Sequence, residues 1–207
     1  GYELGQRLKA YNEAHPGLRG IVLGGHGLFS WGDTSQSCYE NTVDLIERAQ
    51  AWLASERQAR RAVAFGGAAT QSLDDGDRHR VLAAVLPVLR GVASAGKPKL
   101  LHVNTSPEVM EFVNSRDLAP LAALGTSCPD HFLRTKIRPL VIPEAVYRLE
   151  GDPLRAKLEE LLAAYRADYS AYYERCKRAD SPALRDPNPV VLLLPRVGMV
   201  TIAGDKA

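Results

Sequence analysis

Residues 20–50, GIVLGGHGLFSWGDTSQSCYENTVDLIERAQ, decide the fold class of this chain. Ile21–Leu23 are three consecutive apolar residues between glycines, which predicts a short buried strand. After a glycine-rich loop, Thr34 or Ser35 can cap a helix that ends near Arg61. The helical period is carried by Val43, Ile46, Ala49, Trp52 and Leu53. Strand, loop and long helix in this order predict an α/β fold.

The rest of the chain continues the alternation of helices with short apolar strands. Helices are expected from the N-terminus to Pro16, from about Arg78 to Ala95 with a kink at Pro87, from Ser106 onward, and from about Pro153 to Arg178. Strands are expected at KLLHVN (99–104), at PLVIP (139–143) and twice within 186–204. Between them, LGTSCPDHFLRTK (124–136) predicts a polar loop.

A change of composition divides the chain. The segment FGGAATQSLDDGD (65–77) is rich in glycine, alanine and acidic turn formers, which predicts a domain boundary or a long connection. We therefore expect one domain over residues 1–65 and a second, also α/β, over 66–207. The chain opens without methionine in a segment that already has helical spacing, so we expect it to begin within a longer protein.

Composition excludes several classes of partner. The chain has 207 residues, 26 basic and 24 acidic side chains and a net charge of +2, which gives no basis for binding nucleic acid or an anionic membrane. No apolar run approaches the roughly 18 residues of a membrane span, and no signal peptide opens the chain, so a cytoplasmic location is expected. The three cysteines lack C-x-x-C spacing, which argues against a disulfide framework and a thiolate zinc site.

His26 is the first candidate for chemistry, because it follows the predicted strand and has a glycine on each side. Glycines allow a bound ion or substrate to approach the backbone closely. The alternative is a structural histidine that is hydrogen-bonded to loop carbonyls, since a single imidazole has no partner ligands. A dinucleotide-binding turn is disfavoured because Ser30 occupies the third glycine position of the G-x-G-x-x-G pattern.

The run 20–50 resembles the third-ligand segment of the class II aldolase/adducin family, and most closely the aldolase part of bifunctional rhamnulose-1-phosphate aldolase/short-chain dehydrogenase proteins. The resemblance implies that His26 is the third histidine ligand of a zinc ion. The family's His-x-His pair has no counterpart, because the other histidines are isolated: His15, His79, His102 and His131. That pair and the catalytic carboxylate are expected before Gly1, so no catalytic residue is assigned and the isolated chain is expected to be inactive.

The resemblance further implies an α/β architecture, in which residues 1–65 are the C-terminal part of a class II aldolase domain and 66–207 a smaller connecting domain. The implied enzyme is a lyase that cleaves a ketose 1-phosphate, rhamnulose 1-phosphate, into dihydroxyacetone phosphate and lactaldehyde. Its partner is a small sugar phosphate, and a homo-oligomer is expected. Two alternatives remain open: a non-catalytic scaffold of the adducin kind, and a connector of a short-chain dehydrogenase whose NAD-binding domain follows Ala207.

The second candidate is the segment GTSCPDHFLRTK (125–136), which resembles a motif in longer members of the family. It concentrates Asp130, His131, Arg134 and Lys136. Arg134 and Lys136 are suited to a phosphate, and Asp130 can orient His131 as an acid, base or ligand. The alternative is a loop whose polar side chains only bind neighbouring backbone.

Overall fold

The computed structural model describes residues 1–60, 63–94 and 96–205, so the helix ends expected at Arg61 and Ala95 lie outside the described residues. The side chains of Pro129 and Asp130 also lie outside them. The fold is mixed α/β, as predicted. It divides into two compact units, Gly1–Ala62 and Val63–Ala207, and each is described by itself.

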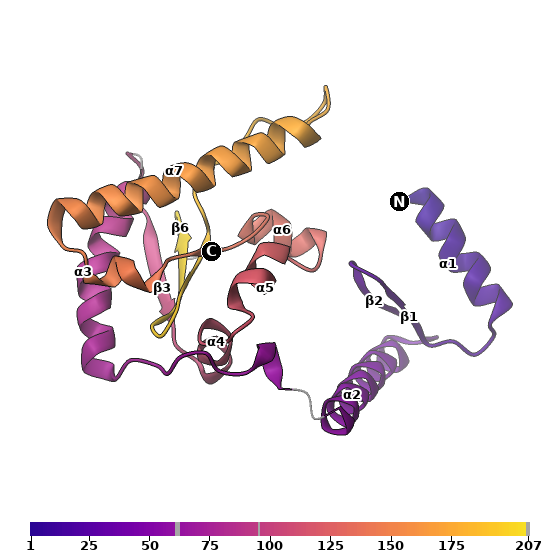
Figure 1. The fold of residues 1–207 in the computed structure, drawn as a ribbon. Helices are drawn as coiled ribbons and strands as arrows, with labels where there is room; N and C mark the ends of the chain where they lie inside the picture. The colour runs from indigo at the N-terminus through magenta and orange to yellow at the C-terminus, as the bar shows by residue number, and fades with distance from the viewer. Residues whose placement is uncertain (61–62, 95, 206–207) are drawn as a thin grey trace. The chain divides into compact units, whose positions relative to one another are not determined.

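The first unit contains a helix, a β-hairpin and a second helix (Figure 1). Its elements are α1 (Tyr2–Ala14), β1 (Gly20–Leu23), β2 (Gly27–Ser30) and α2 (Ser35–Ala59). Of the two predicted cap candidates, Thr34 caps α2: its hydroxyl accepts a hydrogen bond from the N–H of Ser37, and the Ser37 hydroxyl accepts one from the N–H of Thr34. The second strand was not predicted, because a glycine-rich segment offers too few apolar positions for a period of two.

The strand predicted at Ile21–Leu23 is confirmed as part of β1, but the prediction that it is buried was wrong. None of the described residues of the first unit is buried, and Val22 is 75% exposed. A two-stranded hairpin has two faces to cover, and within this unit the two helices leave much of both uncovered. Large apolar side chains are also exposed on the helices, among them Tyr11, Ile46, Trp52 and Leu53.

The second unit is built on a four-stranded sheet. Its strands are β3 (Leu100–Asn104), β4 (Leu140–Val141), β5 (Val191–Leu194) and β6 (Gly198–Ala203), in the order β3-β6-β5-β4. Only β4 and β5 are parallel; the other pairs are antiparallel. The hairpin from β5 to β6 and the strands around 100 and 140 follow the prediction.

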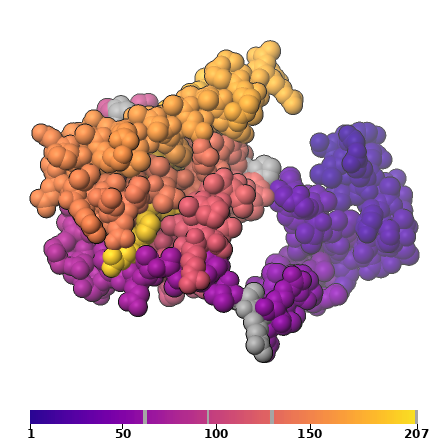
Figure 2. Space-filling model, viewed as in Figure 1, coloured from indigo at the N-terminus to yellow at the C-terminus, as the bar shows by residue number. Residues whose placement is uncertain are grey.

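Helices cover both faces of this sheet because successive residues of β5 point in opposite directions. Leu192 and Leu194 pack with α3 (Asp75–Ser94) and α7 (Gly151–Cys176), whereas Leu193 packs with α4 (Pro107–Val113) and α5 (Leu118–Leu124). The larger core lies between the sheet and the helices α3 and α7. Figure 2 shows α7 running across the outside of this unit. A short 3-10 helix, η2 (Glu144–Arg148), closes that side.

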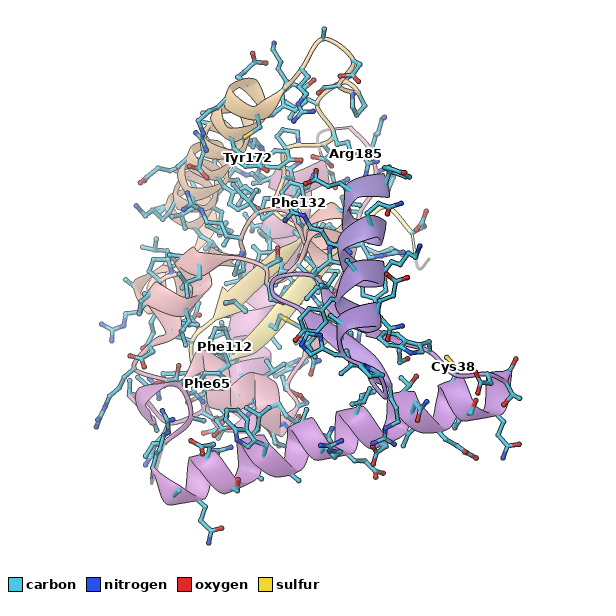
Figure 3. All side chains as sticks on the ribbon, turned by 90° about the vertical axis from the view of Figure 1, so that its right-hand side faces the viewer. Cys38, Phe65, Phe112, Phe132, Tyr172 and Arg185 are labelled. Carbon is cyan, nitrogen blue, oxygen red and sulfur yellow. The ribbon has the colours of Figure 1, made fainter. Side chains whose placement is uncertain are left out.

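The start of the second unit is attached to α4. The 3-10 helix η1 (Ala64–Gly66) brings Phe65 against Phe112, with ring centroids 5.0 Å apart in an edge-to-face arrangement (Figure 3). The N–H of Asp117 donates to the Phe65 carbonyl, and the N–H of Arg116 donates to the Gly67 carbonyl. Residues 63–67 are therefore bound to the second unit.

Two predictions about helices need correction. The segment 124–136 was expected to be a polar loop, but Pro129–Thr135 forms the helix α6. Proline at the first position suits a helix start, and a helix of 7 residues is too short to display a period. The helix α5 was not predicted either. In contrast, α3 continues through Pro87, and α7 lies close to its predicted range.

Candidate functional site

His26 lies in the turn that joins β1 to β2, and its side chain is exposed. Its ring stacks on Phe29 at a centroid distance of 6.0 Å, and no described residue hydrogen-bonds to either ring nitrogen. The imidazole is thus free to bind a ligand. Within the described ranges, however, no three His, Cys, Asp or Glu side chains are grouped to hold a metal ion. At this turn the described residues therefore provide a single imidazole, from His26, and not a complete zinc site.

The structure separates the polar residues of the segment 125–136. Lys136 is 9% exposed, whereas His131 and Arg134 on α6 are exposed to solvent. The side chain of Asp130 lies outside the described residues. Arg134 and Lys136 border a common cleft, but His131 does not.

Lys136 is directed inward by the backbone at the end of α6. Its φ of 68° lies in the left-handed region, and its N–H donates to the Phe132 carbonyl at 3.0 Å. Gly125, at the end of α5, makes room for the chain that follows: a Cβ there would lie 2.0 Å from the Ile137 carbonyl oxygen. Gly125 also has a φ of +78°, so two requirements select glycine at this position.

The ammonium group of Lys136 has two contacts among the described residues. Nζ donates to the Asp186 carbonyl oxygen at 2.6 Å and lies 4.5 Å from the centroid of the Tyr169 ring. No described carboxylate forms an ion pair with it. Burial lowers the pKa of Lys136, and the opposing effect of the Asp186 carboxylate is too small to cancel this. An ammonium has three donors, so at least one remains available.

Asp186 is held in place by a network that reaches α3. Its carboxylate accepts hydrogen bonds from the Lys99 ammonium at 2.5 Å and from the side-chain amide of Asn188 at 2.8 Å. Asn188 is buried. Its side-chain amide donates a hydrogen bond to the Ala93 carbonyl, and its side-chain oxygen accepts one from Arg166 Nε at 2.7 Å. Burial by itself would raise the pKa of Asp186, but the hydrogen bonds from Lys99 and Asn188 outweigh it and leave that pKa below its usual value.

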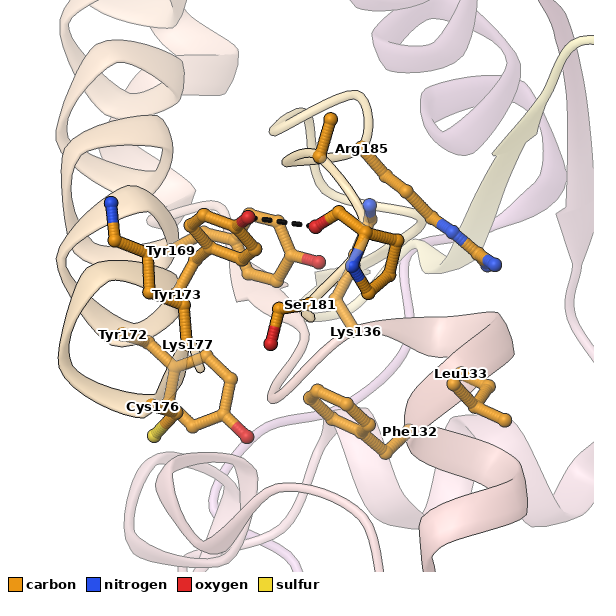
Figure 4. Close-up of a pocket in the computed structure, with 12 residues that line it drawn as sticks. Phe132, Leu133, Lys136, Tyr169, Tyr172, Tyr173, Cys176, Lys177, Ser181 and Arg185 are labelled. Carbon is orange, nitrogen blue, oxygen red and sulfur yellow. Dashed lines mark hydrogen bonds between the residues drawn. The ribbon is translucent and has the colours of Figure 1, made fainter. Parts of the chain in front are cut away.

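A first cleft, here called the tyrosine cleft, lies between α6, the end of α7 and the connection that follows α7 (Figure 4). Phe132 and Tyr172 line it in edge-to-face contact, with ring centroids 5.6 Å apart, and Tyr169 stacks on Tyr172 at 6.4 Å. Tyr173 donates to the Pro182 carbonyl at 2.7 Å, which holds the connection against α7. The wall is therefore aromatic, and Lys136 contributes a cation to it.

A second cleft, here called the cationic cleft, is bordered by four basic side chains and one acidic one: Lys99, Arg134, Lys136, Arg185 and Asp186. Lys99 and Asp186 neutralise each other in an ion pair. Arg134 and Arg185 form no hydrogen bond or ion pair with a described residue. The two clefts share Leu133, Lys136 and Arg185, so they are adjacent.

Sequence reasoning missed most residues of these clefts. Arg185 and Asp186 lie about fifty residues after Lys136, in a proline-rich segment without a recognisable motif. The helix predicted over 153–178 carries tyrosines at 165, 169, 172 and 173, and such a stripe predicts core and interface positions for all four. Tyr165 and Tyr169 are indeed buried, but Tyr172 and Tyr173 line a cleft. The sequence offers no signal that separates the two pairs, because all four tyrosines follow the last leucine of the helix, Leu162.

Comparison with known proteins places the chain in a family. Residues 80–207 match the family described as "Aldolase class II, second domain". Since this match covers more than half of the sequence, the chain belongs to the class II aldolase family. It is 34% identical over 194 residues to "Uncharacterized oxidoreductase YuxG" of Bacillus subtilis (strain 168), covering 91% of this chain and 27% of that relative. The chain thus spans about a quarter of the relative's length.

No solved structure matches the chain significantly. None of the helices in the described ranges combines the length and the hydrophobicity that crossing a membrane requires.

Proposed function

We propose that the chain is part of a zinc-dependent aldolase, a lyase that cleaves a ketose 1-phosphate such as rhamnulose 1-phosphate into dihydroxyacetone phosphate and lactaldehyde. The observation that carries this proposal is the family match over residues 80–207. The proposed protein is a cytoplasmic homo-oligomer whose partner is a small sugar phosphate. Exposed apolar side chains on the first unit are compatible with burial against another part of such an assembly.

His26 is the proposed zinc ligand on this chain. Its exposed imidazole, flanked by Gly25 and Gly27 and without hydrogen bonds from described residues, is available to an ion. Because the described residues supply one ligand, the proposal takes the remaining ligands from residues outside this sequence. A bound zinc supplies Lewis-acid stabilisation of the negative charge that develops when the carbon–carbon bond breaks. The role of His26 is to hold the ion.

The test is zinc content and rhamnulose 1-phosphate cleavage by the full-length protein, compared with His26→Ala. We expect about one zinc per chain and activity, both lost in the variant. His15→Ala, which alters another exposed histidine of the same unit, is the control and should retain both. Full zinc and activity in His26→Ala would remove the ligand assignment. No zinc and no cleavage in any of the proteins would favour the non-catalytic scaffold.

A second candidate function rests on the relative named an oxidoreductase. In this alternative the chain connects to a dehydrogenase domain that binds NAD outside the present sequence. Titration of the full-length protein with NADH, followed by fluorescence, tests the alternative. Binding that is lost when the protein is ended at Asp205 would support a connector next to such a domain. An absence of binding in the full-length protein would contradict it.

A further inference from the structure

We propose that the two clefts beside Lys136 form a binding site for one phosphorylated, sugar-sized ring compound. Its phosphate lies in the cationic cleft and its ring in the tyrosine cleft. This site is separate from the metal site proposed at His26, since all of its residues belong to the second unit.

The charge of the cationic cleft supports an anionic ligand. Besides the Lys99–Asp186 pair, the cleft contains the cations Arg134, Lys136 and Arg185, none of which forms an ion pair with a described carboxylate. Two of the three are arginines, whose planar guanidinium matches phosphate oxygens in a bidentate manner. Lys136 differs from a solvated surface lysine, because it is 9% exposed and held by the Asp186 carbonyl.

Burial of Lys136 gives the second argument. Placing an ammonium in a half-enclosed position costs solvation, which is why its pKa is lowered. The Tyr169 ring and one backbone carbonyl compensate for only part of that loss. A phosphate in contact with Nζ would offset the rest of the lost solvation, because its negative charge stabilises the ammonium. The fold thus maintains a charge at the junction of the two clefts that an anion would stabilise.

The tyrosine cleft supplies a surface for the rest of the ligand. Phe132 and Tyr172 contact each other, so a ring compound would lie on their faces, against the connection that contains Ser181. Figure 4 shows Ser181 and the rings of Phe132 and Tyr172 around the same space. Aromatic walls with a few hydroxyl groups are typical of sites for small polar ring compounds.

The test is isothermal titration calorimetry of the full-length protein with three probes: inorganic phosphate, glucose 6-phosphate and glucose. We expect inorganic phosphate to bind, glucose 6-phosphate to bind more tightly, and glucose to bind at least about tenfold more weakly than its phosphate. The variant Arg134→Ala/Arg185→Ala should weaken both phosphate probes by about tenfold or more. Neither arginine has a hydrogen bond or ion pair with a described residue, so the variant should fold.

Two further variants complete the design. Arg178→Ala, an exposed arginine on the same connection that borders neither cleft, should leave all affinities unchanged. Tyr172→Ala should weaken glucose 6-phosphate and not inorganic phosphate. No binding of either phosphate probe, or equal affinities in the double-arginine variant, would overturn the proposal. Binding should persist in His26→Ala, which distinguishes this site from the proposed metal function.

Discussion

Lys136 is buried because its own backbone and that of a distant glycine permit it. The left-handed conformation at Lys136 turns the chain inward. Because Gly125 has no Cβ, Ile137, the residue after Lys136, can pass it at close range. The sequence indicated that Lys136 belongs to a polar segment that could bind phosphate, but not that it differs from Arg134 in burial. A string of polar residues has no pattern that separates inward from outward positions.

Gly125→Ala should therefore destabilise the protein by more than about 1 kcal/mol, because alanine is strained at positive φ and its Cβ would collide with Ile137. Gly91→Ala is the matched control: this glycine lies within α3, and nothing is within 4 Å of a Cβ there. We expect it to stabilise by about 0.5–1 kcal/mol. Urea denaturation measures both free energies of unfolding. Equal effects of the two substitutions would contradict the close approach.

Because the pKa of Tyr165 differs between the folded and the unfolded chain, the free energy of unfolding should depend on pH. The Tyr165 hydroxyl donates to the Arg138 carbonyl at 2.8 Å, and burial raises its pKa above the usual 10.0. Above about pH 10 the unfolded chain loses this proton more readily than the folded one, so stability falls as pH rises. Tyr165→Phe should cost about 1 kcal/mol at neutral pH and show a shallower fall above pH 10.

Urea denaturation across that pH range, with wild type and variant side by side, is the measurement. Tyr147 also has a raised pKa, caused by burial and by Glu144, so some decline should remain in the variant. Curves that stay parallel up to high pH would show that Tyr165 does not titrate differently in the folded state.

At the scale of elements, α7 shows how one helix serves two purposes. Its first half buries Leu154, Leu158 and Leu162 in the larger core, and its last turns present tyrosines to the tyrosine cleft. The sequence predicted this helix because the leucines recur with helical spacing. It did not predict the cleft, which also needs α6 and the connection around Ser181.

Leu158→Ala should lower the free energy of unfolding by about 2–5 kcal/mol, because Leu158 is 0% exposed and its loss leaves a cavity between α7 and the sheet. Leu124→Ala is the control, since that leucine is 78% exposed at the end of α5. Its effect should be about 0.5 kcal/mol or less. Chemical denaturation provides both values, and a small effect at Leu158 would place it outside the core.

The whole molecule consists of two units with very different interiors. Every side chain in the buried hydrophobic core belongs to the second unit, between Val85 and Ile202. No described residue of the first unit is buried. A unit with no fully buried apolar side chain gains little of the main favourable contribution to folding, so most of the stability of the chain resides in the second unit.

A chain of residues 63–207 should therefore unfold cooperatively, with the same urea midpoint as the 207-residue chain. Residues 1–62 alone should give the circular dichroism and narrow amide dispersion of a largely unfolded peptide. Dispersed amide signals from 1–62, or a clearly lower midpoint for 63–207, would show that the first unit contributes stability of its own.

The sequence by itself determined the α/β class, the long helices, the cap at Thr34 and most strands, because these depend on local periodicity and on residues close in the chain. It also indicated His26 and the segment around Lys136 as places for chemistry, and these remain predictions. Only the tertiary structure decided which strands are buried, where Lys136 lies, and that Arg185 and Tyr172 join it. These depend on contacts between segments far apart in the sequence, and such contacts leave no local pattern.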